Sequence, residues 1–251
     1  MSGRAVRSLL AAISLVSLVG CSAGGEVISV DWPDPSPSPT AARSGASPGT
    51  DPSVAAPTTP RPEDEQAMVA QAQRLLPEIP IKGRAPKTGY DREKFGQRWA
   101  DVDRNGCDQR NDVLTRDLTD RTYRSAASCA VATGVLDDPY TGRSITFTRG
   151  QDTSTAVQID HVVSLSNAWQ TGASSWDEQQ REAFANDAEN LLAVDGPTNL
   201  AKSDGDAATW LPPHRDSWCS YTARQTVIKD QYGLWMTPPE HDRITEILTQ
   251  C

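Results

Sequence analysis

The 251-residue sequence is poor in histidine, in long apolar runs and in net positive charge. It has three His and no Cys-x-x-Cys pair, which argues against a zinc centre built from such ligands. The apolar run Leu9–Val19 is too short to span a bilayer as a helix. All of the net charge of −9 belongs to the chain from Tyr90 onward, where 16 Lys and Arg face 25 Asp and Glu. This balance argues against a broad basic surface, although a local basic groove beside a bound cation is compatible with it.

The first 21 residues have the order of an export signal. Arg4 and Arg7 precede the apolar run, and Leu18-Val-Gly-Cys21 ends it in a pattern that resembles the bacterial lipobox. We therefore expect a lipoprotein signal peptide over residues 1–21, with Cys21 lipidated. The protein would be exported and anchored to the outer face of the cell membrane through lipid alone. An ordinary cleaved signal with an incidental Cys is the alternative, and would give a secreted protein.

Residues 22–89 separate this signal from the main domain. Residues 22–62 are rich in Pro, Ser and Thr, a composition typical of a disordered tether. Residues 63–89 are expected to be a short helix and a connector, because Pro77 and Pro80 stop the pattern. The domain proper is expected over residues 90–251.

Four cysteines remain once Cys21 is set aside, and an even number in an exported domain indicates disulfides. Three connectivities exist for four cysteines. We prefer the pairing that is local in sequence, Cys107–Cys129 and Cys219–Cys251.

Short strands and helices follow one another in the pattern from residue 90 onward. Phe95 and Trp99, four residues apart, are assigned to the core on one helical face. The fold class is therefore α+β. Strands are expected at 131–136, 144–148, 157–163 and 191–194, and helices at 63–76, 110–118, 176–185, from 196 onward, 218–232 and 239–248.

One Asp-His pair is a candidate for catalysis and metal binding. His161 follows Asp160 within an apolar run typical of a strand. A histidine suits a general base near neutral pH, and Asp and Asn oxygens suit Mg²⁺. Because neighbouring side chains of a strand point to opposite faces, both can serve one site only where the strand ends or bulges. A structural Asp-His pair is the alternative for these two residues alone.

A second segment favours the chemical interpretation. Asn190 precedes the strand pattern 191–194, Asn199 follows nine residues after Asn190, and Lys202-Ser-Asp204 comes next. Together with Asp160-His161 this resembles the HNH, or ββα-metal (His-Me finger), nucleases. The run from Glu189 is similar to the HNH domain of the RNA-guided Cas nucleases.

A wider resemblance covers about residues 90–251. It is to an exported actinobacterial family related to the C-terminal nuclease domain of the GmrSD restriction enzymes. It implies a ββα-metal unit within a mainly helical domain. The segments that carry it are 103–112, 159–162, 190–199 and 206–212.

The resemblance implies a role for each residue of the motif. His161 would be the general base, Asp160 and Asn199 the metal ligands, and Asn190 the residue that ties the loop and orients the base. Lys202 would contact phosphate. Because both later positions are Asn, Mg²⁺ or Mn²⁺ is favoured over Zn²⁺.

The function expected is metal-dependent endonuclease cleavage of nucleic acid, with DNA favoured over RNA, low sequence specificity and no partner protein. Arg110 is a candidate phosphate clamp held in place by a Cys107–Cys129 bridge. A surface salt bridge to a neighbouring Asp is the alternative for Arg110.

Two other functions compete with this one. The first is an inert envelope module that keeps the fold and binds wall polymers, or binds calcium through Asp101-x-Asp103-x-Asn105-Gly106, which resembles the start of an EF-hand loop. The same residues are also typical of a turn without metal. The second is a cell-wall hydrolase, against which the shortage of His argues.

Overall fold

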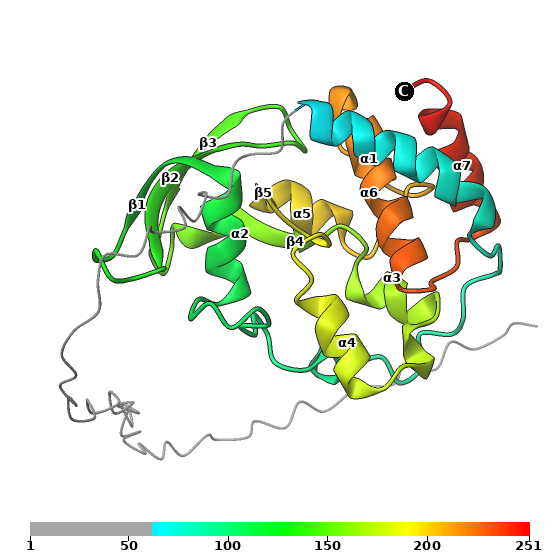
Figure 1. The fold of residues 1–251 in the computed structure, drawn as a ribbon, viewed down its shortest axis with the longest axis horizontal. Coiled ribbons are helices and arrows are strands. Elements are labelled where there is room, and N and C mark those ends of the chain that lie inside the picture. The colour runs from blue at the N-terminus through cyan, green and yellow to red at the C-terminus, as the bar shows by residue number, and fades with distance from the viewer. Residues whose placement is uncertain (1–61) are drawn as a thin grey trace, which may run out of the picture. The chain divides into compact units, whose positions relative to one another are not determined.

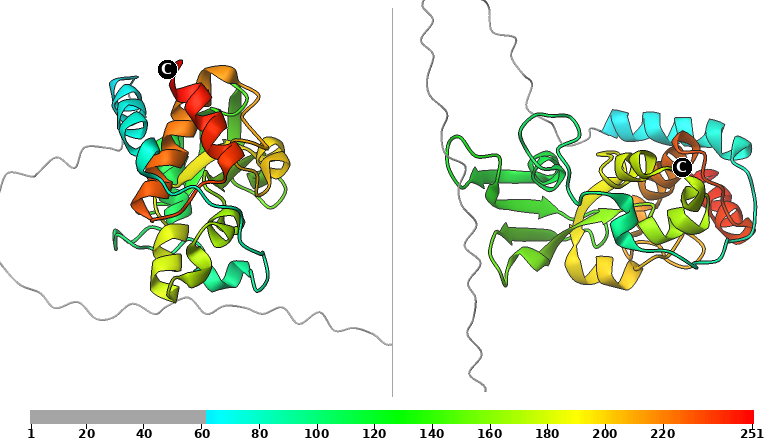
Figure 2. Two further views of the ribbon diagram at one scale, coloured as in Figure 1. Left: turned by 90° about the vertical axis from the view of Figure 1, so that its right-hand side faces the viewer. Right: turned by 90° about the horizontal axis from the view of Figure 1, so that it is seen from below.

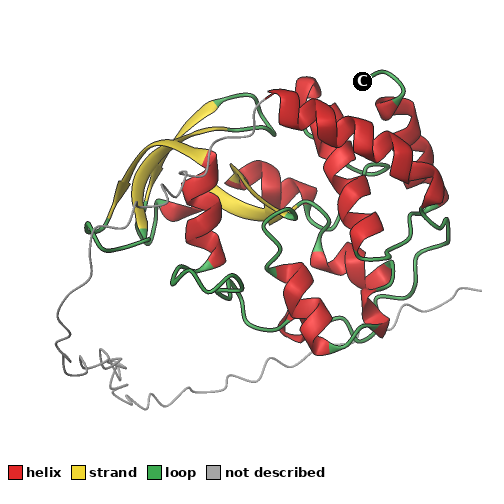
Figure 3. Cartoon of the chain, in the orientation of Figure 1, coloured by secondary structure: helices red, strands yellow, loops and turns green. Residues whose placement is uncertain are grey.

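The computed structural model describes residues 62–251, in which a three-stranded sheet lies at one end and most helices lie toward the other (Figures 1 and 3). The mixed α and β class with small antiparallel sheets is as predicted. The strands are β1 (Leu118–Tyr123), β2 (Val131–Asp137), β3 (Ser144–Thr148), β4 (Val157–His161) and β5 (Leu191–Asp195). The helices are α1 (Pro62–Leu75), α2 (Gln109–Asp117), α3 (Leu165–Gln170), α4 (Glu178–Ala185), α5 (Gly196–Lys202), α6 (Trp218–Gln231) and α7 (Pro238–Leu248).

An antiparallel sheet of order β1-β2-β3 forms one end of the fold. Strand β1 and helix α3 were not expected from the sequence. In β1 only Leu118 is buried, so its sequence lacks the alternation that marks a strand. The strand exists because β2 offers it a partner, and α2 packs Val113 and Leu114 into the same core.

Strands β4 and β5 form a separate antiparallel pair at the centre (Figure 1). Ile159 pairs with Ala193, and His161 pairs with Leu191. The chain between the two strands contains α3 and α4, and α5 follows β5 directly. The pair therefore brings the two chemical segments together, although about 30 residues separate them in sequence.

Helix α5 begins where the sequence predicts. The Asp195 carboxylate accepts a hydrogen bond from the backbone N–H of Thr198 at 2.9 Å, and Pro197 occupies the first turn. Position 196 admits only glycine, because a Cβ there would lie 2.0 Å from the carbonyl oxygen of Thr155. These features fix the direction in which α5 leaves the central pair.

Helix α1 packs beside α6 and α7 at the other end (Figure 2). Val69 and Ala72 on α1, together with Leu76 directly after it, join a core with Met236 and Ile244. Helix α1, within the predicted helix-and-connector segment 63–89, therefore supplies one wall of this core.

Both predicted disulfides are present, Cys107–Cys129 and Cys219–Cys251. The first joins the loop before α2 to the chain before β2, and the second joins α6 to the residue after α7. Each disulfide stabilises the fold mainly by lowering the conformational entropy of the unfolded chain.

The predicted signal peptide 1–21 with Cys21, and the predicted tether up to residue 61, lie outside the described residues. Among residues 62–251 no helix is long and apolar enough to cross a membrane.

Helix α1 gives a stability test. Leu76 is 6% exposed, so Leu76→Ala should lower the free energy of unfolding by about 2–5 kcal/mol. Leu75→Ala is the matched control and should cost clearly less, because Leu75 is only half-buried. Urea unfolding monitored by circular dichroism measures both, and equal losses would contradict the packing of α1.

Candidate active site

His161 stands at the last position of β4 and is 7% exposed. Its Nε2 lies 2.8 Å from the carbonyl oxygen of Ala185, at the end of α4. We assign the proton to Nε2, since only an N–H can bond a carbonyl, which leaves the lone pair on Nδ1. Burial, together with the nearby charges of Arg92, Lys202 and Arg98, lowers the pKa of His161 to about 3. The imidazole is therefore neutral at pH 7.

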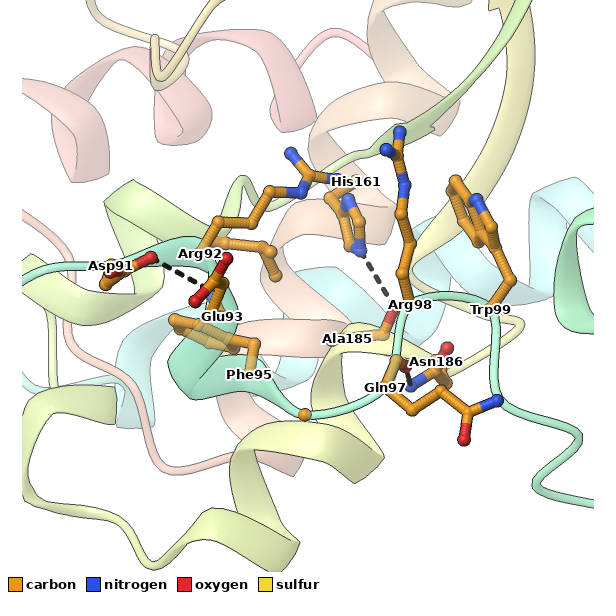
Figure 4. Close-up of a pocket in the computed structure, with 12 residues that line it drawn as sticks. Asp91, Arg92, Glu93, Phe95, Gln97, Arg98, Trp99, His161, Ala185 and Asn186 are labelled. Carbon is orange, nitrogen blue, oxygen red and sulfur yellow. Dashed lines mark hydrogen bonds between the residues drawn. The ribbon is translucent and has the colours of Figure 1, made fainter. Parts of the chain in front are cut away.

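A cavity of about 380 Å³ opens at His161 (Figure 4). One wall is the segment 91–99, and another is the end of α4. Its lining includes Arg92, Arg98, Trp99, His161, Leu165 and Asn186. The ring of Trp99 lies nearly parallel to that of His161, with their centroids 6.1 Å apart.

The segment beside the cavity is held in an unusual conformation. Trp99 has φ of 59°, which bulky residues rarely adopt. Gly96 has φ of 73°, and a Cβ there would lie 2.7 Å from the side chain of Glu182. Phe95 and Trp99 therefore do not share a helical face as predicted, because the chain turns between them.

Asn186 holds this segment in place. Its amide nitrogen donates to the Gln97 carbonyl at 3.1 Å, and its amide oxygen accepts from the N–H of Ala100 at 2.9 Å. The preceding carbonyl, that of Ala185, holds His161. The end of α4 thus fixes the base candidate and the cavity wall relative to each other.

Asp160 points to the other side of β4. Its carboxylate accepts from the Tyr140 hydroxyl at 2.5 Å and pairs with Lys202 Nζ at 2.9 Å. Asp160 is 5% exposed. Burial raises its pKa, whereas Lys202 and the Tyr140 hydroxyl oppose that rise.

Lys202 lies beneath β4 and not in the cavity. Its side chain is 0% exposed, and Nζ donates to Asp160 and to the carbonyl of His161 at 2.8 Å. The predicted contact with phosphate is therefore not available to Lys202 in this arrangement. Here the Lys202 ammonium group neutralises the buried Asp160 carboxylate. Without this counter-ion, burying the carboxylate would carry a high desolvation cost.

Asn199 extends from α5 toward the same side of β4 as Asp160. Its amide donates to the side-chain oxygen of Gln158 at 3.0 Å, and residues 158 and 160 share one face of the strand. Within residues 62–251 no group of three His, Cys, Asp or Glu side chains could hold a metal. Asp160 and Asn199 carry side-chain oxygens of the kind that Mg²⁺ prefers, but those of Asp160 are bonded to Tyr140 and Lys202.

Asn190 ties the end of β4 to the start of β5. Its side chain is fully buried, accepts from the N–H of Val163 at 2.9 Å and donates to the Val163 carbonyl at 3.2 Å. Its own carbonyl accepts from Val162 at 2.8 Å. These bonds hold the chain where it leaves His161.

Arg110 lies in the first turn of α2, after the Cys107–Cys129 bridge, and does not line the cavity. Among the described residues its side chain has no hydrogen bond or ion pair, so the salt bridge of the alternative interpretation is not seen there. Burial lowers its pKa, and the charges of Arg149 and Arg98 act in the same direction. Arg110 is thus a cation close to Arg98.

The loop that resembles an EF-hand start is closed by its own hydrogen bonds. Asp101 accepts from the N–H groups of Asn105 and Gly106, and Asp103 accepts from Asn105. Those oxygens are already used, as in a turn that needs no ion.

Sequence reasoning missed several residues of the site. Tyr140 and Gln158 bond the two predicted metal ligands, and no local pattern marks them. The sequence could have indicated Arg92 and Arg98, because basic residues alternate with aromatic ones from Tyr90 to Trp99. The assignment of those aromatic residues to the core left the arginines between them without a role.

Residues 108–247 match the family of GmrSD restriction endonucleases, C-terminal domain. An uncharacterized secreted protein of Arthroderma benhamiae is 39% identical over 182 residues, which is 72% of this chain and 84% of that protein. No solved structure matches. The cavity wall at 91–99 precedes the matched residues, whereas His161, Asn190 and Asn199 fall within them.

The Lys202–Asp160 pair gives a second stability test. Lys202→Met leaves a buried carboxylate without its counter-ion and should cost about 3–5 kcal/mol of unfolding free energy in EDTA. The double variant with Asp160→Asn should recover part of this loss. Lys229→Met is the matched control, because Lys229 is equally buried and pairs with Glu240 at 2.5 Å. A Lys202→Met protein as stable as the parent would contradict the assigned pair.

Proposed function

The chain belongs to the family of GmrSD restriction endonuclease C-terminal domains, which are HNH-type, and on this basis we propose that it hydrolyses phosphodiester bonds of nucleic acid. The observation that carries the proposal is the His161 imidazole, held by the Ala185 carbonyl at a cavity lined by arginines. We assign β4, β5 and α5 to the ββα-metal unit, with α3 and α4 inserted between its strands.

His161 is the general base in this proposal. Nδ1 takes a proton from water, the water oxygen bonds to phosphorus, and the bond from phosphorus to the 3′ oxygen breaks. The leaving oxygen then takes a proton from solvent. The Ala185 carbonyl at the end of α4 fixes the ring and stabilises the imidazolium, because carbonyls at a helix C-terminus carry negative partial charge.

Asp160 and Asn199 are the residues we propose to hold Mg²⁺ or Mn²⁺. When bound, the ion would neutralise charge on the phosphate and on the leaving oxygen. Because Asp160 and His161 point to opposite sides of β4, this requires the phosphate to bind across the end of the strand, which is at His161. Asp160 can bind an ion only if Lys202 gives up a carboxylate oxygen. Lys202 would then be free to approach the phosphate, which is the role that the sequence predicts for it.

Two further residues support this site. Asn190 keeps the chain after His161 in place and so orients the base. Arg110 adds a cation beside Arg98 and would contact a phosphate along the bound strand.

We propose that the protein acts outside the cytoplasm, with lipid on Cys21 as its only membrane anchor. The relative from Arthroderma benhamiae is a secreted protein, and disulfides suit an oxidising compartment. DNA is favoured over RNA as substrate, and no partner protein is required. An inert module with the same fold is the alternative, and a cleavage assay distinguishes the two.

The cleavage test compares the parent with His161→Ala on plasmid DNA, single-stranded DNA and RNA, with Mg²⁺, Mn²⁺ or EDTA. We expect metal-dependent cleavage that falls by a factor of about 10²–10⁴ in the variant, because the base is lost. His241→Ala on α7 is the matched control and should retain activity. A folded parent that cuts none of these substrates would support the inert module.

Metal binding has a readout that needs no substrate. Without Lys202 the Asp160 carboxylate has no counter-ion, so Mn²⁺ at about 100 times its Kd should return about 2.7 kcal/mol to Lys202→Met. Thermal unfolding with and without Mn²⁺ measures this. Lys229→Met should show no such rescue, and rescue of neither variant would argue against a metal at Asp160.

A further inference from the structure

Two arginines line the His161 cavity without a carboxylate partner. Among residues 62–251, neither Arg92 nor Arg98 takes part in an ion pair, although the chain carries a net charge of −9. Both precede the family-matched residues and had no place in the predicted site. A role for them in binding substrate rests on the proposed nuclease function.

The surroundings hold both side chains near the base. The Arg98 guanidinium lies 5.5 Å from the centre of the Trp99 ring, which in turn lies parallel to His161. Figure 4 shows the His161 ring between the side chains of Arg92 and Arg98. Asn186 fixes the backbone on either side of Arg98, through Gln97 and Ala100.

The carboxylates of the same wall do not neutralise these cations. Asp91 accepts from the N–H of Glu93 at 3.0 Å and so caps the short helix over Arg92–Phe95. Burial lowers the pKa of Arg92, and the charge of Arg98 lowers it further, so the two cations repel each other. An anion that binds between them would relieve this repulsion.

A phosphodiester carries the negative charge that would pair with these two cations. Guanidinium groups bind phosphate oxygens with paired hydrogen bonds, and they stay charged at any ordinary pH. We propose that Arg92 and Arg98 bind the scissile phosphodiester beside His161. The segment 91–99 then supplies the phosphate-binding half of the site, and the family-matched residues supply the base.

The test measures binding separately from cleavage. Labelled single-stranded and duplex DNA are titrated with full-length His161→Ala protein over a series of NaCl concentrations, with fluorescence anisotropy as the readout. The slope of log affinity against log salt counts the phosphates contacted. Adding Arg92→Gln and Arg98→Gln should reduce the slope by about one for each arginine.

Two controls separate charge from folding. Arg124→Gln, outside the cavity, should leave slope and affinity unchanged. Lysine at both positions should keep the slope but weaken binding, because an ammonium lacks the planar fork. In the active protein, the Gln pair should raise KM at least tenfold.

The outcomes are distinguishable. If the His161→Ala protein binds no nucleic acid and the parent cuts none, both the proposed nuclease function and this inference are overturned. A parent that cuts normally, with the same slope and KM after both arginines are replaced, would overturn this inference alone.

Discussion

Consecutive residues of a strand point to opposite sides, and this constraint at the end of β4 organises the whole site. Asp160 points toward Lys202 of α5 and toward Tyr140 in the turn between β2 and β3, and both bond its carboxylate. His161 points toward α4 and the cavity. One strand thus separates a buried, charge-balanced carboxylate from a neutral base, and Lys202 links the two sides by bonding both Asp160 and the His161 carbonyl.

The end of α4 holds His161 in place, as Lys202 holds the Asp160 carboxylate. The carbonyl of Ala185 fixes the tautomer of His161, and the side chain of Asn186 holds the segment that carries Arg98 and Trp99. Both depend on one short helix inserted between β4 and β5. A reactive group and its cationic wall are therefore positioned by a rigid element, although the wall itself is irregular chain.

Net charge and local charge point in different directions in this protein. The domain is acidic, yet Arg92, Arg98 and Arg110 lie close enough for the charge of Arg98 to act on the other two. Overall composition argued against a broad basic surface, and none is needed for a phosphate to bind in a small cavity. Several of the acidic residues instead serve as helix caps, such as Asp177 and Asp195.

The sequence by itself determined the mixed fold class, most helices and strands and the Asp160-His161 motif, whereas it left three disulfide connectivities open, of which the preferred one is present. The features that it determined depend on local periodicity, on caps and on spacing, which neighbouring residues specify. Only the tertiary structure decided that Lys202 is buried and that residues 91–99 form a wall of the His161 cavity. Those facts depend on contacts between segments far apart in the chain. Strand β1 is the same case, because its polar residues become a strand only beside β2.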